Sequence, residues 1–498
     1  MNTFKQDYLK KINDCIAKGR YKDTWESLSQ YRVPECYKNL KFGIFIHWGI
    51  FSVPAFSNEW YSRNMYIEGT REFEHHVKTY GPHKDFGYKD FIPMLTASNF
   101  DAVRWVELFK EAGAQYMIPV AEHHDGFQMY GSDVSHWNSV EMGPKRNILG
   151  ELSAAAHKLG LTAGCSSHRI EHWFFMSHGR KFESDIEENQ KEGDFYWPAM
   201  PEGDHFDSFS KPEPSAEFME DWLVRSCELV DKYAPKIFYF DWWIHHNAAK
   251  PYLRKFAAYF YNRAEENGRM AVINYKHDAF AFGTAVVDIE RGKFADVKPY
   301  VWQTDTAVAW NSWCYTTENS YKDPVEIVQD LVDIVSKNGR LLLNIGPKAD
   351  GTIPDEDTNI LKAIGRWLKI NGEAIYNSQV WRSSGEGPTM TVEGQFGEGD
   401  RKAYTPADIR FTCANGCIYA IVLVMPEDGR VTVRSLAQAA PGNAPVFTGI
   451  IKDVRVLSGD DMPVAIPVEY TRDADGMHIT ADGIRSKYPV VFRIEVDD

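Results

Sequence analysis

Short apolar runs alternate with amphipathic stretches along the first three quarters of the chain, and this alternation is the sequence feature that most constrains the fold. From about Lys41 to Tyr376 the apolar runs are rich in Val, Ile and Phe. The alternation is typical of βα units, which build a parallel sheet, and eight strands are the number that closes a (β/α)₈ barrel. The predicted strands are Phe42–His47, Gln115–Ala121, Leu161–Ser166, Ile237–Asp241, Ala271–Asn274, Ala285–Ile289, Val301–Thr304 and Leu341–Ile345.

Helices are predicted between these strands. In the first helix Val103, Val106 and Phe109 recur at helical spacing, so they share one face. Two long stretches, Phe51–Phe91 and Trp173–Pro214, follow predicted strands and interrupt the alternation of strands and helices. Loops of this kind at the carboxyl ends of barrel strands are where barrels carry their sites. The predicted helices are Asp101–Ala112, Leu152–Leu159, Ala216–Tyr233, Pro251–Glu266, Pro324–Ser336 and Thr358–Asn371.

Beyond Val380 the composition changes to β-branched residues, glycines and turn dipeptides. Two apolar strands, Cys417–Met425 and Val490–Val496, stand out in this part. The pattern predicts a separate all-β domain resembling a sandwich. We therefore expect a barrel domain with an N-terminal helical extension over residues 1–378 and a smaller β-sandwich domain over residues 379–498. Two roles are open for the smaller domain: it only braces the barrel, which is favoured because no aromatic cluster there suggests a second sugar site, or it shapes the entrance to the site.

Composition limits the classes of partner. The chain has 55 Lys and Arg against 70 Asp and Glu, a net charge of −15, which disfavours nucleic acid and anionic membranes as partners. Its first eleven residues lack the apolar core of a signal peptide, and no run of about 18 apolar residues occurs. Seven scattered cysteines do not resemble a disulfide framework. These features favour a cytoplasmic protein, although a processed exported form would look similar, and they leave a homo-oligomer open.

Titratable side chains cluster at the carboxyl ends of the predicted strands. Any one of them is by itself more typical of a hydrogen-bonded rim residue, but several that converge on one face of a barrel indicate a site. These residues are His47, His123, His124, His168, Asp241 and Glu290.

Two carboxylates among these residues point to a reaction class. Asp241 ends an apolar run and has aromatic neighbours, a costly position for a charge without a function or partner. Strand alternation places Asp288 and Glu290 on one side of their strand, with Glu290 nearer the rim. Two carboxylates that face one pocket from different strands suit glycoside hydrolysis, with one as nucleophile and the other as general acid. Rim carboxylates paired with cations, such as the adjacent Arg291, are the alternative.

Aromatic residues near the same rim are consistent with a sugar ligand, because indole rings stack on the apolar face of a pyranose while His and Glu bind its hydroxyl groups. Each tryptophan taken alone is more often a core residue. The tryptophans in or near predicted rim segments are Trp48, Trp60, Trp137, Trp173, Trp242, Trp243, Trp302 and Trp313.

A metalloenzyme is the competing interpretation. Residues His168, Glu171 and His172 match the H-x-x-E-H pattern of one metalloprotease group, and His123 and His124 could add ligands. The pattern requires a helix, so that both histidines project from one face. Here it directly follows a predicted strand and leads into a long irregular loop. We therefore expect no metal and no organic cofactor.

Four segments resemble the α-L-fucosidases of glycoside hydrolase family 29, and the resemblance extends across the barrel and more loosely into the C-terminal part. Lys41–Gly49 is similar to the family's first strand and Asn58–Tyr61 to the loop motif after it. Glu122–Phe127 is similar to the paired-histidine motif after the second strand, and Asn344–Gly351 to the end of the last strand. The resemblance implies hydrolysis of a terminal α-linked L-fucose, with retention, from a fucosylated oligosaccharide or glycoconjugate.

The resemblance also implies roles for individual residues. Asp241 corresponds to the nucleophile, and Glu290 matches the acid/base of members with a similar Asp-x-Glu-Arg-Gly segment. We add His168, Trp302 and Trp313 as contacts from their predicted rim positions. The residues at positions that bind fucose or lie beside the nucleophile in the family are His47, Glu59, Trp60, His123, His124 and Tyr239.

The chain departs from the family at two places. It has Cys165–His168 where a sugar-contacting Tyr-Tyr-Ser often follows the third strand, and Trp242 where a small residue often follows the nucleophile. His168 is expected to supply the missing polar contact. A silent sugar-binding protein is disfavoured because a lectin needs no nucleophile, whereas action on L-galactosides, which differ only by a hydroxyl at C6, is left open.

Overall fold

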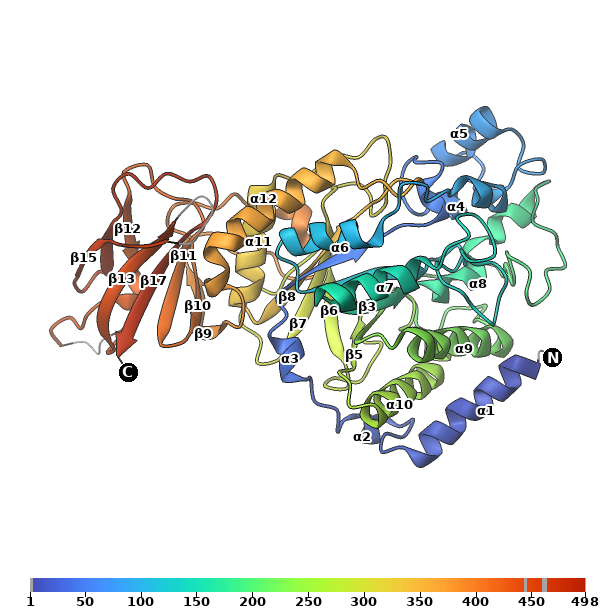
Figure 1. The fold of residues 1–498 in the computed structure, drawn as a ribbon, viewed down its shortest axis with the longest axis horizontal. Helices are drawn as coiled ribbons and strands as arrows, with labels where there is room; N and C mark the ends of the chain where they lie inside the picture. The colour runs from blue at the N-terminus through green and yellow to red at the C-terminus, as the bar shows by residue number, and fades with distance from the viewer. Residues whose placement is uncertain (1–2, 443–445, 459–463, 498) are drawn as a thin grey trace.

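Eight parallel strands close into a barrel in sequence order, with β8 returning to β1 (Figure 1). The computed structural model describes residues 3–442, 446–458 and 464–497. All eight predicted strands are present, and the one predicted at Val301–Thr304 continues to Ala307. The barrel fold is therefore confirmed. Its strands are β1 (Phe42–Ile46), β2 (Tyr116–Glu122), β3 (Thr162–Ser167), β4 (Ile237–Phe240), β5 (Val272–Tyr275), β6 (Val286–Glu290), β7 (Trp302–Ala307) and β8 (Gly339–Ile345).

The barrel is wrapped by helices, and the six predicted ones are all present as α6, α7 and α9 to α12. Residues 276–285 and 291–301, all of them described, contain no helix. The connections before and after β6 therefore both lack the helix that usually packs against the outside of a barrel strand. Within the described residues no helix is long and apolar enough to cross a membrane. The helices are α1 (Thr3–Lys18), α2 (Trp25–Leu28), α3 (Glu35–Lys38), α4 (Tyr61–Asn64), α5 (Arg71–Tyr80), α6 (Ala102–Glu111), α7 (Ile148–Leu159), α8 (His172–Phe175), α9 (Ala216–Tyr233), α10 (Lys250–Glu266), α11 (Pro324–Ser336) and α12 (Asp355–Asn371).

Side chains fill the inside of the barrel. Tyr239 packs edge-on against Phe45 with ring centroids 4.9 Å apart. The hydroxyl of Tyr116 donates a hydrogen bond to Oε1 of Gln303 over 3.1 Å. A Cβ on Gly43 would lie 2.4 Å from the ring of Tyr116, so only glycine leaves room for that tyrosine. Because this interior is packed, a ligand can enter only at the rim.

The C-terminal part is all β. A six-stranded sheet in the order β14-β13-β17-β11-β10-β9 faces a three-stranded sheet in the order β12-β16-β15, with an apolar core between them. All pairings in these sheets are antiparallel, which confirms the predicted sandwich-like domain. Its strands are β9 (Gln379–Glu386), β10 (Ile409–Ala414), β11 (Cys417–Val422), β12 (Arg430–Val433), β13 (Ile450–Ser458), β14 (Val464–Pro467), β15 (Glu469–Arg472), β16 (Met477–Thr480) and β17 (Val490–Asp497).

This sandwich packs directly on α11 and α12 (Figure 1). The buried Asp333 of α11 accepts a hydrogen bond from Nε of Arg410 on β10 over 2.5 Å and pairs with Lys337 at 2.8 Å. Trp367 of α12 donates its indole N–H to the carbonyl of Pro489 over 2.8 Å. Buried charged groups that are paired fix the geometry of an interface, because separating them would leave a charge without a partner.

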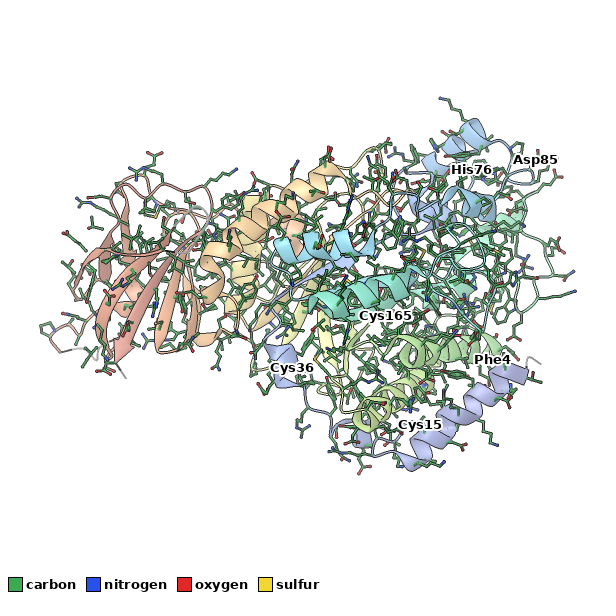
Figure 2. The ribbon with its side chains drawn as sticks, in the orientation of Figure 1. Phe4, Cys15, Cys36, His76, Asp85 and Cys165 are labelled. Atoms are coloured by element: carbon green, nitrogen blue, oxygen red, sulfur yellow. The ribbon has the colours of Figure 1, made fainter. Side chains whose placement is uncertain are left out.

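The cysteines lie on separate elements, and Cys15, Cys36 and Cys165, which are labelled in Figure 2, lie far apart in the barrel part of the chain. Cys15 is on α1, Cys36 on α3 and Cys165 on β3. All seven belong to the described residues and all are free thiols. Cys413 and Cys417 belong to the paired strands β10 and β11, but Cys413 faces Ile418 across the ladder.

The contact between α12 and α6 depends on a glycine. A Cβ on Gly365 would lie 2.0 Å from the carbonyl oxygen of Glu111 and 2.9 Å from Cα of Ala112. Alanine is intrinsically the better helix former, but overpacking against backbone costs about 1–3 kcal/mol. We therefore predict that Gly365→Ala lowers the midpoint of thermal and denaturant unfolding.

The matched control is Gly399→Ala, since a Cβ there has nothing within 4 Å. Its unfolding midpoint should equal that of the wild type. An unchanged or raised midpoint for Gly365→Ala would show that the two helices have room to separate.

Candidate active site

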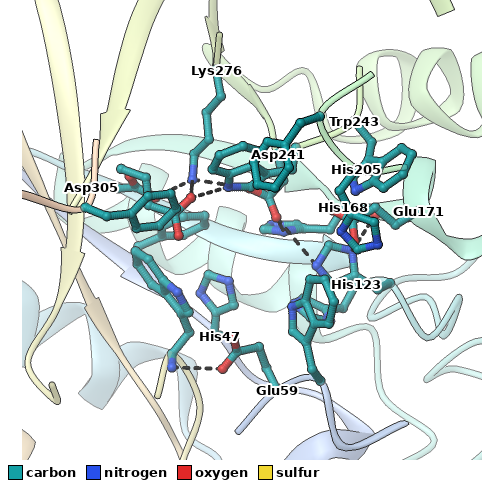
Figure 3. Close-up of a pocket in the computed structure, with 18 residues that line it drawn as sticks. His47, Glu59, His123, His168, Glu171, His205, Asp241, Trp243, Lys276 and Asp305 are labelled. Carbon is teal, nitrogen blue, oxygen red and sulfur yellow. Dashed lines mark hydrogen bonds and ion pairs between the residues drawn. The ribbon is translucent and has the colours of Figure 1, made fainter. Parts of the chain in front are cut away.

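A cavity of about 300 Å³ opens at the carboxyl ends of the barrel strands (Figure 3). It collects side chains from the barrel strands, from the long loops that follow β1 and β3, and from the C-terminal part. The residues that line it are Phe45, His47, Glu59, Trp60, His123, His124, His168, Glu171, His205, Phe206, Asp241, Trp242, Trp243, Lys276, Glu290, Asp305, Trp313 and Phe396.

Lys276 reaches in between Asp241 and Asp305 in this cavity (Figure 3). It follows β5, and its ammonium nitrogen lies 3.3 Å from Oδ1 of Asp241 and 3.3 Å from Oδ2 of Asp305. It also forms an ion pair with Glu290. One buried cation therefore holds three carboxylates from β6, β7 and the end of β4 in one place.

The surroundings of the two predicted catalytic carboxylates drive their pKa values in opposite directions. Burial favours neutral Asp241, but the positive charge of Lys276 and the hydrogen bond from His168 hold the pKa of Asp241 well below its ordinary value. Burial raises the pKa of Glu290 to about 7, and the negative charges of Asp305 and Asp241 act in the same direction against that of Lys276. Near neutral pH, Asp241 is ionised and much of Glu290 is protonated.

Four histidines form the other wall of the cavity, and for two of them, His168 and His47, a hydrogen bond shows that Nδ1 carries a proton. Nδ1 of His168 lies 2.8 Å from Oδ2 of Asp241 and must donate, because an ionised carboxylate only accepts. Its Nε2 lies 2.9 Å from the hydroxyl oxygen of Ser166. Nδ1 of His47 lies 2.7 Å from Oδ1 of Asn344 and donates to it, which leaves Nε2 of His47 as an acceptor.

Three of these imidazoles are neutral. Burial first, and the neighbouring histidines second, lower the pKa of His47 and of His123 well below the ordinary value. Burial also lowers the pKa of His124 to about 3. Nδ1 of His123 is buried and has no hydrogen-bond partner among the described residues. Neutral rings with free nitrogens are suited to hydrogen bonds with uncharged hydroxyl groups.

Glu59 and two tryptophans complete the wall. The carboxylate of Glu59 accepts the backbone N–H of Trp313 over 3.0 Å. Burial raises the pKa of Glu59 in spite of this bond. The ring of Trp60 lies edge-on to that of His124, with centroids 5.9 Å apart. The cavity thus combines acceptors and donors with aromatic faces, which is the mixture that a sugar requires.

Comparison with known proteins identifies the family. Residues 9–373 match the sequence model of the family described as alpha-L-fucosidase. The chain belongs to the α-L-fucosidase family of glycoside hydrolases. It is 33% identical to human plasma alpha-L-fucosidase over 384 residues, 75% of each protein, and 30% identical to rat tissue alpha-L-fucosidase over 430 residues, 84% of this chain and 82% of the relative. The crystal structure of Thermotoga maritima alpha-fucosidase in complex with fucose superposes with a TM-score of 0.71 at 29% identity, covering 95% of this chain and all of the other.

Within this fucosidase fold, two predicted contact residues lie outside the cavity. Trp302 is the first residue of β7 and donates its indole N–H to the carbonyl of Lys337 over 2.9 Å, so its prediction as a site residue is wrong. The error arose because the predicted strand ended at Thr304, whereas β7 continues to Ala307. The end of β7 that faces the cavity is therefore several residues beyond Trp302. Tyr239 lies one layer below the rim and donates to Oδ2 of Asp305 over 2.9 Å, so it supports the floor of the cavity.

Other cavity residues were missed by the sequence analysis. Lys276 directly follows the apolar strand β5, and Asp241, which the sequence analysis did identify, directly follows β4 in the same way. Asp305 lies one residue beyond the predicted end of its strand. Glu171 was considered only as part of a metal motif, yet it is buried and its Oε2 has no hydrogen-bond partner among the described residues. Burial raises the pKa of Glu171 well above its ordinary value.

The C-terminal part does more than brace the barrel. Phe396 lies between β9 and β10 and lines the cavity of the barrel. No local pattern in the sequence indicates that a segment more than a hundred residues beyond Glu290 returns to the site. Of the two roles that the sequence left open, this position supports the second, in which the C-terminal part shapes the entrance to the site.

The H-x-x-E-H motif does not form one metal site. His168 points into the cavity, whereas His172 directs its two ring nitrogens at the carbonyl oxygens of His124 and Phe195, at 2.8 and 3.0 Å. The ligand atoms of two other groups come within 4.8 Å of one another, and both groups include His168. Because both nitrogens of His168 already have partners, a metal ion would have to break the hydrogen bond of His168 to Ser166 or the one to Asp241. The two groups are His47, His123 and His168, and His124, His168 and Asp241.

His168 should hold the carboxylate of Asp241 ionised and oriented. We predict that His168→Ala lowers kcat/KM for an aryl α-L-fucoside about 10- to 100-fold, the effect of one hydrogen bond to a charged group. Because His168 lowers the pKa of Asp241, its loss should also move the acidic limb of the pH–rate profile to higher pH.

Two further variants test this role in the same steady-state assay. His168→Asn carries an amide N–H that can replace Nδ1 and should recover part of the activity. His157→Ala, on the exposed face of α7, should resemble the wild type. An unaltered rate and acidic limb in His168→Ala would contradict the assignment.

Proposed function

We propose that the protein is a retaining exo-glycosidase that hydrolyses terminal α-L-fucosyl linkages of oligosaccharides or glycoconjugates. The supporting observation is the pair Asp241 and Glu290, which share Lys276 in one cavity and have pKa values driven apart. A retaining pair needs its carboxyl groups about 5–5.5 Å apart, and an inverting pair about 6.5–9.5 Å. Two carboxylates that contact the same ammonium group favour the shorter separation.

In the first step, ionised Asp241 attacks the anomeric carbon of the fucosyl unit. Glu290 gives its proton to the oxygen of the leaving group, so that an alcohol departs and a covalent fucosyl-enzyme forms. Lys276 stays protonated, since the surrounding carboxylates raise its pKa although burial opposes this. Its charge keeps Asp241 available as a nucleophile.

In the second step, Glu290 must act as a base, which requires its pKa to fall. The loss of a neighbouring negative charge lowers this pKa. The negative charge of Asp241 is one of the causes that raise the pKa of Glu290. That charge disappears when Asp241 becomes an ester, whereas Lys276 remains beside Glu290. The pKa of Glu290 therefore falls in the intermediate, and its carboxylate takes a proton from the water that attacks the anomeric carbon. Fucose leaves with its configuration retained.

The cavity supports a single terminal sugar as the bound unit. Its volume of about 300 Å³ is at the small end of ligand sites. Nε2 of His47 can accept a hydroxyl proton, the unpartnered Nδ1 of His123 can donate or accept a hydrogen bond according to its tautomer, and Glu59 offers a carboxyl group. Trp60 and Trp313 offer aromatic faces to the apolar side of the ring and its methyl group.

Asp241→Gly tests the nucleophile. With 4-nitrophenyl α-L-fucopyranoside, we predict that this variant loses at least about a thousandfold in kcat, because no covalent intermediate can form. Added azide should restore part of the release of nitrophenol, since the small anion can attack in the space left by the carboxylate.

Controls separate this result from the metal interpretation. Azide should not accelerate the wild type, and a chelator should leave its turnover unchanged. Absence of fucoside turnover in the wild type, or turnover that a chelator removes, would contradict the proposed function.

The pH dependence tests the role of Glu290. Because its pKa is raised to about 7 and the protonated form is the acid, kcat/KM should be high below pH 7 and fall as the pH rises through that value. Glu290→Gln, measured over the same range, should lose this basic limb. Its rate should fall about 10²- to 10⁴-fold with a sugar leaving group, and less with 4-nitrophenol, which needs little protonation. A basic limb near pH 7 that persists in Glu290→Gln would assign the limb to another group.

A further inference from the structure

The segment 387–408 leaves the C-terminal sheet after β9, reaches the barrel and returns to β10. The backbone N–H of Phe396 donates to the carbonyl of Glu290 over 2.8 Å. A Cβ on Gly292 would lie 1.8 Å from the carbonyl oxygen of Gly394, so the two chains approach as closely as glycine allows. The segment thus lies directly beside the predicted acid/base, on the side where the barrel has no helix.

Polar contacts hold this segment in place. Glu398 pairs with Arg291 at 2.6 Å and with Lys322 at 2.8 Å, and it accepts a hydrogen bond from the hydroxyl of Thr306 over 2.6 Å. Its backbone N–H also donates to the carbonyl of Arg291 over 3.0 Å. The position of the segment is therefore set by the barrel rim itself.

The segment adds an aromatic surface next to Glu290. The ring of Phe396 stacks on that of Trp242, with centroids 5.6 Å apart and planes 12° apart. Trp242 in turn donates its indole N–H to Glu290. Phe396 is 54% exposed, and Phe206, which also lines the cavity, is 84% exposed. Large apolar side chains exposed at the mouth of a polar cavity indicate a contact surface for a ligand.

The general acid fixes which part of the substrate meets this surface. Because Glu290 must reach the oxygen that leaves, the leaving group has to lie on the side of Trp242 and Phe396. We propose that Phe396, stacked on Trp242, forms a leaving-group subsite that packs against the apolar face of the sugar ring to which fucose is attached. This inference rests on the proposed fucosidase function and adds the C-terminal segment as a determinant of substrate specificity.

Two substrates that differ only in the leaving group test the subsite. α-L-Fucosyl fluoride has a single atom as its leaving group and cannot reach Phe396, whereas an α-L-fucosylated disaccharide places a ring there. We expect Phe396→Ala to lower the ratio of kcat/KM for the disaccharide to kcat/KM for the fluoride about three- to tenfold, the effect of one aromatic contact. Phe396→Trp should restore the ratio.

Phe282→Ala is the matched control, because Phe282 is also exposed, at 71%, but packs against Tyr300 away from the cavity. Its ratio should equal that of the wild type. An unchanged ratio in Phe396→Ala, including an equal loss with both substrates, would overturn the subsite. Failure of the wild type to hydrolyse the fluoride at all would instead overturn the proposed function, so the two failures are distinguishable.

Discussion

One buried ammonium group organises the site. Lys276 contacts Asp241, Glu290 and Asp305, three buried carboxylates that would otherwise repel one another. Without a cation in that position, burial would drive all of the carboxyl groups toward their neutral forms. With it, one carboxylate is stabilised as an anion, and the extra negative charge of its neighbours leaves Glu290 close to its midpoint at neutral pH.

The rest of the fold serves that arrangement. Parallel strands deliver Asp241, Lys276 and Glu290 to one rim from three neighbouring strands. In the packed layer below the rim, Tyr239 donates a hydrogen bond to Asp305, so that even this carboxylate has a defined partner. The neutral histidines add polar groups to the wall without adding charge. They therefore leave the opposed pKa shifts of Asp241 and Glu290 in place.

The sequence was sufficient for those features that depend on local pattern. Asp241 and Glu290 could be predicted because each ends an apolar strand, and the histidines because they follow one. Lys276 carried the same signal, but its strand was short and ended one residue later than expected. Trp302 was wrongly placed at the rim because its strand was predicted to end at Thr304, before the true end of β7 at Ala307. Phe396 had no signal at all, since its position depends on the packing of two distant segments.

The close approach of the C-terminal segment to Glu290 has a consequence for how the protein is made. The proposed nucleophile, Asp241, and the histidines of the cavity lie in the first half of the chain. The surroundings of Glu290, the proposed acid/base, are complete only when residues near 400 have been synthesised and Phe396 and Glu398 have docked on the barrel. Because synthesis proceeds from the N-terminus, the residues that line most of the cavity are made before this segment. The proposed leaving-group subsite can therefore be complete only after the second domain has been synthesised.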